Sequence, residues 1–152
     1  MFVAQSEFYG VRVMDKRRLG AQGPEISAIG IGAMSFSNFY GATDETQSHA
    51  ILSKALDEGV THIDTANVYG MGTSETVIGT FLAKQGKRRN ELFSIASKAS
   101  IARRKELGER YFDNSPTYLE SELDKTLARL GVDTIDLYYL SLIHISEPTR
   151  PY

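Results

Sequence analysis

Three residues whose side chains suit carbonyl chemistry follow apolar runs of this sequence. Asp64 ends one such run, Tyr69 lies five residues further on, and Lys98 ends a second run 34 residues after Asp64. A tyrosine with an ordinary pKa of about 10 is a weak proton donor at neutral pH. A lysine ammonium beside the phenol lowers that pKa because it stabilises the phenolate, and a carboxylate can hold the ammonium charged. The residue types therefore match a Tyr69 proton donor with Asp64 and Lys98 as its tuning pair.

A second interpretation fits the same spacing. The ends of neighbouring strands lie side by side in a parallel sheet, so Asp64 and Lys98 can equally form a structural ion pair. Tyr69 is then an ordinary aromatic residue of a loop. The residues alone leave both interpretations open.

Hydrophobic periodicity predicts strands that alternate with helices, which favours an α/β fold with a parallel sheet. A hairpin is expected to turn at residues 20–24 and to lead towards a first strand at 29–32. Later strands are expected at 60–64, 92–97 and 135–140. The helices are expected to begin near Asp44, Ser74 and Pro116, with Asp44 and Ser74 as N-caps, and to end near Gly59, Gly86 and Gly131.

The strand and helix patterns also predict which apolar side chains are covered. Ile51 is expected on the buried stripe of the first helix. Side chains of one parity along the strands should point the same way as Asp64, into the space that a barrel encloses. This inward set comprises Val60, Ile135, Leu137 and Tyr139.

Over residues 17–140 the chain resembles the N-terminal part of an aldo-keto reductase. The matching segments follow the order of the family: RRLG at 17–20, GIGAM at 30–34, ALDEGV at 55–60, DTA at 64–66, YG at 69–70, IASK at 95–98, LARLG at 127–131 and IDLYYL at 135–140. The resemblance implies the N-terminal half of a (β/α)8 TIM barrel that begins with a β-hairpin. It implies NADPH-dependent reduction of an aldehyde or ketone, with a small-molecule carbonyl substrate.

The resemblance also implies roles for particular residues. Tyr69 would donate the proton, and Asp64 and Lys98 would tune it. Gly32, Ala33, Met34 and Asp64 would contact the nicotinamide half of the cofactor. A non-enzymatic relative that senses redox state or regulates a channel is the alternative, because such subunits keep the same three polar residues.

The chain departs from the family near its C-terminus. The family has a catalytic histidine directly after the fourth strand, where this sequence has Ser141. Residues 141–152 resemble the in-frame translation of a transposon-end sequencing adapter, so we exclude them from the fold prediction as a non-native tail, and His144 with them. Residues 1–13 precede the family's usual start and are expected to be an upstream extension or the result of a misassigned start codon. A complete barrel needs about 250 residues, so we expect residues 14–140 to be a truncated barrel of about four strand-helix units.

Composition excludes few classes of protein. A formal charge of −2 gives no reason to expect nucleic acid or membrane binding, and the chain has no cysteine. Residues 1–13 read as neither a signal peptide nor a membrane span, so a cytoplasmic location is expected. No metal-ligand cluster is evident, and the Gly30-Ile31-Gly32 segment lacks the third glycine of a dinucleotide fingerprint. Half a barrel is expected to be inactive alone and to self-associate.

Other polar and aromatic residues receive ordinary interpretations. His49 is expected to be a partly buried or surface residue and His62 a hydrogen-bonded core residue. The basic runs at 87–89 and 103–105 are expected to be solvated. Residues 36–40 and the loop at 99–115 follow strand ends and should border the substrate, and their aromatic content suits an apolar carbonyl compound.

Overall fold

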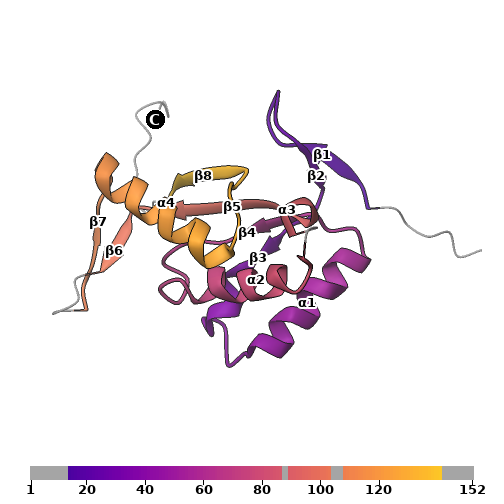
Figure 1. Cartoon of the computed structure of the whole chain (residues 1–152), viewed down its shortest axis with the longest axis horizontal. Coiled ribbons are helices and arrows are strands. Elements are labelled where there is room, and N and C mark those ends of the chain that lie inside the picture. Colours follow the sequence, from indigo (N-terminus) through magenta and orange to yellow (C-terminus); the bar gives the residue numbers. More distant parts are fainter. Residues whose placement is uncertain (1–13, 87–88, 104–107, 142–152) are drawn as a thin grey trace, which may run out of the picture.

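The computed structural model describes residues 14–86, 89–103 and 108–141. The expected upstream extension at 1–13 lies outside these residues, as do His144 with the rest of 142–152 and parts of both basic runs. Within the described part, a parallel sheet carries helices on one face and leaves the other face open (Figure 1).

Four parallel strands form this sheet. They are β3 (Ile31–Gly32), β4 (His62–Asp64), β5 (Ser94–Ala99) and β8 (Leu137–Leu140), hydrogen-bonded in that order. All four strands were expected from the sequence, and each is shorter or starts later than its apolar run. The reason is that apolar residues such as Phe93 and Ile135 pack beside the strands without joining the ladder.

Two antiparallel hairpins lie at opposite ends of the molecule (Figure 1). The first, β1 (Lys16–Arg18) with β2 (Glu25–Ser27), confirms the hairpin expected around residues 20–24. The second, β6 (Ile101–Arg103) with β7 (Arg110–Phe112), lies where the sequence predicted only a loop. Each of its strands is three residues long, too short to give a clear alternating pattern.

Helices connect the parallel strands across the outer face of the sheet. They are α1 (Glu45–Asp57), α2 (Thr73–Ala83), α3 (Arg89–Leu92) and α4 (Pro116–Leu130), with a 3-10 turn η1 (Ala33–Ser37) after β3. The Asp44 carboxylate accepts the Gln47 amide at 2.7 Å, which confirms this N-cap. Pro116 occupies the first position of α4, and Gly131, at φ 67°, ends that helix in the left-handed region.

The predicted N-cap of α2 is wrong. The helix begins two residues earlier than a Ser74 cap requires, after Gly72 at φ 93°, and Ser74 lies fully buried within its first turn. The Ser74 hydroxyl donates to the Ala33 carbonyl at 2.7 Å and lies 2.9 Å from the Thr65 hydroxyl. The Ser74 hydroxyl therefore bonds to Ala33 and Thr65, which lie outside α2, and does not cap the helix as the local sequence predicted.

The core lies between the sheet and the helices. Its fully buried members include Leu52 from α1, Ile63 from β4, Ile78 and Leu82 from α2, and Leu130 from α4. Burying a side chain of this size contributes roughly 1.5 to 3 kcal/mol. This layer holds the strand ends, and the polar residues that follow them, in place.

Three burial predictions are wrong. Ile51 is 49% exposed because it lies at the edge of a stripe centred on Leu52. Val60 was grouped with Leu137 and Tyr139 on the open face, yet it is buried where those two are exposed, and Ile135 packs against the helix-side core instead of facing inward. Both residues precede their strands, where the alternation of side chains across the sheet does not hold. Leu137 and Tyr139, which do lie in β8, are exposed on the open face as expected.

Candidate active site

Asp64 and Lys98 meet at the carboxyl ends of β4 and β5. Asp64 is in register with Ala96, so Lys98 lies two residues further along the same face of the sheet. The Lys98 ammonium donates to an Asp64 carboxylate oxygen and to the Thr65 carbonyl, the latter at 2.8 Å. The Lys98 side chain is 10% exposed and that of Asp64 is 32% exposed. The contact expected from the spacing therefore forms in a partly buried position.

The environment of Lys98 keeps it charged. Burial by itself would lower the pKa of the ammonium, but hydrogen bonds to Asp64 and Tyr139 and the negative charge of Asp64 outweigh it. The pKa of Lys98 is consequently raised above its ordinary value. The site thus holds a permanent positive charge close to the strand ends at neutral pH.

Tyr69 lies in the loop after β4, with its ring facing this charge. The Lys98 Nζ atom is 5.0 Å from the centre of the Tyr69 ring, within the range of a cation–π contact. Among the described residues, the Lys98 ammonium contacts the ring of Tyr69 and not its hydroxyl. This contact places the positive charge of Lys98 against the aromatic face of Tyr69.

Tyr139 is a further member of the cluster that sequence reasoning did not assign. Its hydroxyl donates to the second Asp64 oxygen and accepts from the Lys98 Nζ atom at 3.1 Å. Burial, followed by the hydrogen bond to Asp64, raises the pKa of Tyr139. Its strand parity had placed it on the inner face, and its register opposite Lys98 is the signal that could have identified it.

The expected nicotinamide contacts lie beside this cluster. Gly32 pairs with Asp64 in the sheet, and a Cβ atom added to Gly32 would meet open space. Ala33 is fully buried, and its carbonyl is taken by Ser74, so its side chain offers no surface to a ligand. Met34 lines a neighbouring pocket. The assignment of these residues to a cofactor stays a prediction.

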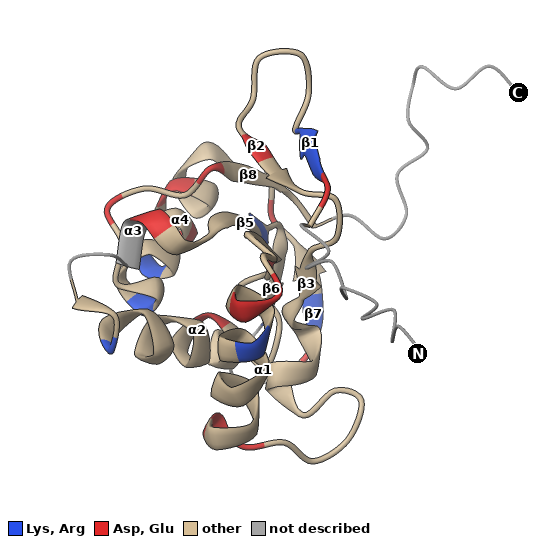
Figure 2. Ribbon diagram, turned by 90° about the vertical axis from the view of Figure 1, so that its right-hand side faces the viewer, with Lys and Arg blue, Asp and Glu red and all other residues tan. Residues whose placement is uncertain are grey.

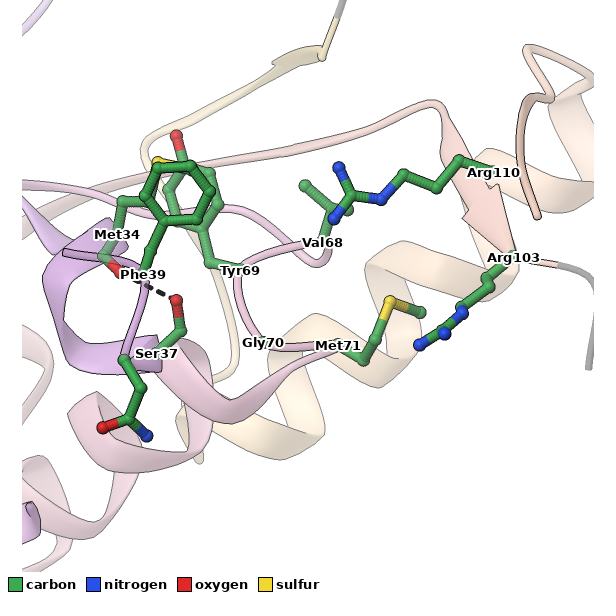
Figure 3. A pocket seen from close by; sticks show the side chains of 10 residues that line it. Met34, Ser37, Phe39, Val68, Tyr69, Gly70, Met71, Arg103 and Arg110 are labelled. Carbon is green, nitrogen blue, oxygen red and sulfur yellow. Dashed lines mark hydrogen bonds between the residues drawn. The ribbon is translucent and has the colours of Figure 1, made fainter. Parts of the chain in front are cut away.

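A pocket of about 390 Å³ opens next to Tyr69 (Figure 3). Residues from η1 and the segment after it form one wall, the Tyr69 loop forms the floor, and the β6–β7 hairpin closes the far side (Figure 3). Both segments that were expected to border a substrate therefore border this pocket. The lining residues are Met34, Ser37, Asn38, Phe39, Val68, Tyr69, Gly70, Met71, Arg103 and Arg110.

A buried polar network supports β5 from the opposite face of the sheet. The Glu75 carboxylate, which is fully buried, accepts from the Ser97 hydroxyl at 2.7 Å and from the Thr126 hydroxyl at 2.9 Å. The Arg129 Nε atom donates to it at 2.6 Å. Ser97 directly precedes Lys98, so this network holds the strand at the residue before the ammonium.

The two described histidines behave as structural residues. The Nδ1 atom of His62 lies 3.1 Å from the Ser94 carbonyl on the neighbouring strand, and the side chain is partly buried. The Nε2 atom of His49 lies 3.0 Å from the Val77 carbonyl, which joins α1 to α2. Neither histidine contacts the cluster around Lys98 in the described part of the chain.

Within the described ranges, no group of three or more histidine, cysteine, aspartate or glutamate residues could hold a metal ion. No helix among those residues is both long enough and apolar enough to cross a membrane.

Comparison with known proteins identifies the family to which this fold belongs. The family model for the aldo/keto reductase family matches residues 28–152. The chain belongs to this family. The match runs through the residues that we expect to be a non-native tail, and that expectation stays a prediction.

Two kinds of relative support the same assignment. An aldo-keto reductase of Schizosaccharomyces pombe, yakc, whose name includes NADP(+), is 42% identical over 115 residues, which is 76% of this chain and 33% of that protein. The structure of an aldo-keto reductase from Bacillus halodurans, in its holo form, is 33% identical with a TM-score of 0.73, over 89% of this chain and 42% of that one. The chain thus spans about a third of the curated relative's length.

A third relative is more distant. The glycerol dehydrogenase of Gluconobacter oxydans is 27% identical with a TM-score of 0.66, over 82% of this chain and 38% of that one. With four parallel strands and helices on their outer face, the chain is an α/β half of a TIM barrel that begins with a hairpin, as expected.

Proposed function

We propose that this chain supplies the proton-donating half of an NADPH-dependent reductase of aldehydes or ketones. The observation that carries the proposal is the position of the Lys98 ammonium, held by Asp64 and 5.0 Å from the ring of Tyr69 at the edge of a pocket. An acid, an amine and a phenol at the carboxyl ends of barrel strands are the arrangement that proton transfer to a carbonyl oxygen needs.

The residues of this chain would act on the oxygen of the substrate. Tyr69 donates its hydroxyl proton to the developing alkoxide, and the Lys98 ammonium stabilises the phenolate that remains. Asp64 holds the ammonium charged and fixes its direction. Tyr139 bridges Lys98 and Asp64 and limits their movement.

The cofactor has a suitable place beside this cluster. Gly32 presents open space where any other residue would carry a Cβ atom, and it lies in register with Asp64. A flat nicotinamide ring can approach the backbone there, close to Asp64, with Met34 on the pocket side. NADPH, when bound, supplies a hydride to the carbonyl carbon.

Steady-state kinetics of a full-length version of the protein test this proposal. Oxidation of NADPH that depends on an added aldehyde, and that follows the aldehyde concentration to saturation, is the expected result. NADPH binding without turnover of any aldehyde would contradict it and would favour the alternative, a redox-sensing or channel-regulating subunit.

A further inference from the structure

Two arginines face each other across the β6–β7 hairpin. Arg103 and Arg110 are cross-strand partners in register, so their side chains leave the same face of the hairpin. Like charges directly opposite each other destabilise a pair of strands. Within residues 14–86, 89–103 and 108–141, no carboxylate forms an ion pair with either guanidinium. The hairpin therefore carries a concentrated positive charge at a cost in stability.

This charge faces the candidate active site. Both arginines line the pocket of about 390 Å³ that Tyr69 also lines. Figure 3 shows the Arg110 guanidinium extending towards Val68 and that of Arg103 extending towards Met71. The Arg103 Nε atom donates to the Gly108 carbonyl at 3.0 Å, which fixes the start of its guanidinium against the hairpin. The terminal nitrogens of both groups lie on the pocket side (Figure 3).

We propose that this pocket selects carbonyl substrates that carry an oxyanion, a carboxylate or a phosphate, at the end remote from the carbonyl. This inference rests on the proposed function, because it places the carbonyl oxygen at Tyr69. A planar guanidinium binds two oxygens of a carboxylate or phosphate at once, and such charge-assisted hydrogen bonds are among the stronger ones in proteins. A volume of about 390 Å³ is sufficient for a small molecule of this kind.

The remaining lining suits the middle of such a substrate. Val68 and Met71 offer apolar surface between Tyr69 and the two guanidinium groups, and Met34 and Phe39 line the pocket on the other side of Tyr69 (Figure 3). The aromatic segment after the first strand predicted an apolar substrate, and this prediction fits only the apolar part of the pocket. The hairpin, which the sequence did not predict, supplies the charged part.

Matched pairs of substrates test the inference in a full-length version of the protein. One pair is 4-carboxybenzaldehyde and benzaldehyde, and the other is glyceraldehyde 3-phosphate and glyceraldehyde. We expect the unsubstituted enzyme to prefer the charged member of at least one pair, and the pair that shows the preference identifies the anion. In the double variant R103Q/R110Q, kcat/KM for the charged member relative to the neutral one should fall roughly 10-fold to 100-fold.

A matched variant controls for loss of charge alone. Arg17→Gln removes a positive charge from β1, which lies at the opposite end of the molecule from the β6–β7 hairpin (Figure 1) and is coloured as basic in Figure 2. The Arg17 side chain is exposed. It should leave the ratio of kcat/KM values unaltered. A ratio that does not change in R103Q/R110Q, or that falls as far in Arg17→Gln, would overturn the inference.

Anion binding can be measured separately from aldehyde reduction. If the full-length protein reduces none of the four aldehydes, the proposed function is wrong, and calorimetric titration with benzoate and with inorganic phosphate decides the anion site. Binding that is lost in R103Q/R110Q and kept in Arg17→Gln supports the site. Absence of binding to the unsubstituted protein overturns it.

Discussion

The two faces of the parallel sheet are built from the same strands and differ in almost every physical respect. On the outer face, Ile63, Ile95 and Ser97 are almost completely buried beneath the helices. On the inner face, Lys98, Leu137 and Tyr139 alternate with them, and both β8 residues are more than a third exposed. One step along a strand therefore separates side chains that stabilise the fold from side chains that are available for chemistry.

The polar groups on the two faces also differ in how completely they are paired. Glu75 on the outer side accepts three hydrogen bonds and is closed to solvent. The inner cluster of Asp64, Lys98 and Tyr139 is paired internally, but Asp64 and Tyr139 stay partly exposed to solvent. A buried group whose hydrogen bonds are all made within the protein cannot exchange protons with a ligand. A cluster that is partly exposed to solvent can do so. Substitutions on the outer face should consequently lower stability, and substitutions on the inner face should lower turnover.

The largest expected effect concerns the unfinished inner face. In the described part of the chain, β3 and β8 are edge strands with no partner on their outer sides, and Leu137 and Tyr139 are exposed. The 152-residue chain should therefore show no aldehyde reduction and no tight NADPH binding, and should aggregate or pair into dimers. Size-exclusion chromatography and NADPH fluorescence titration check this. A stable monomer that binds NADPH at micromolar concentration contradicts it.

On the inner face of a full-length version, Tyr69→Phe should lower turnover by roughly 100-fold to 10,000-fold, the usual contribution of a positioned general acid. NADPH affinity should change little because only a hydroxyl is removed. Steady-state kinetics and fluorescence titration measure the two quantities.

The matched control for Tyr69→Phe is the same substitution on the outer face. The Tyr138 hydroxyl donates to the Leu119 carbonyl at 3.3 Å beneath α4, away from the pocket. Tyr138→Phe should affect stability and leave turnover close to normal. Equal losses of turnover in the two variants would contradict the inference that the inner face serves catalysis and the outer face stability.

On the outer face, Glu75→Ala should lower the free energy of unfolding by about 3 kcal/mol, because the buried Ser97 and Thr126 hydroxyls lose their acceptor and Arg129 keeps only the more distant carboxylate of Glu122. Urea denaturation of a full-length version measures this loss. The control, Glu120→Ala, removes an exposed carboxylate from α4, the helix that carries Thr126 and Arg129, and should change the free energy little. Similar losses in both variants would mean that the buried network contributes nothing particular.

Lys98→Met tests whether the inner ion pair is catalytic or structural. Without the ammonium, a phenolate is no longer stabilised, so any limb of the pH–rate profile due to the proton donor should move to higher pH. The profile of kcat against pH measures the shift. An unchanged profile accompanied only by lower stability would favour the structural ion pair.

The smallest expected effect is a titration on the outer face. Burial, together with the charges of Glu122 and Glu75, raises the pKa of Tyr138 to about 12. Its unfolded value is about 10, so the folded state holds this proton more tightly. The resulting stability is present below pH 10 and is lost as the pH rises from about 10 to about 12. Ultraviolet difference titration should show a late tyrosine component that Tyr138→Phe removes. Its persistence in that variant would assign it to another residue.

Local sequence was sufficient for the elements that depend on near neighbours. Asp44 caps α1 through a residue three positions away, and Pro116 and Gly131 bound α4 through their own backbone preferences. Apolar runs that alternate with helical patterns predicted a parallel sheet. The Asp64–Lys98 contact followed from that sheet, because it brings the ends of neighbouring strands together. Ser74 failed as a cap because its partners, Ala33 and Thr65, come from other elements.

The sequence by itself determined the family, the parallel half barrel and the strand ends that carry Asp64 and Lys98, because these depend on periodicity and motif spacing. Only the tertiary structure decided which distant groups meet. It placed the Tyr139 hydroxyl on Asp64, 75 residues away, and Arg129 on Glu75, 54 residues away. It also formed the hairpin that sets Arg103 opposite Arg110 beside the pocket of Tyr69. Such contacts depend on side-chain directions and packing across the folded chain, which no short window of sequence contains.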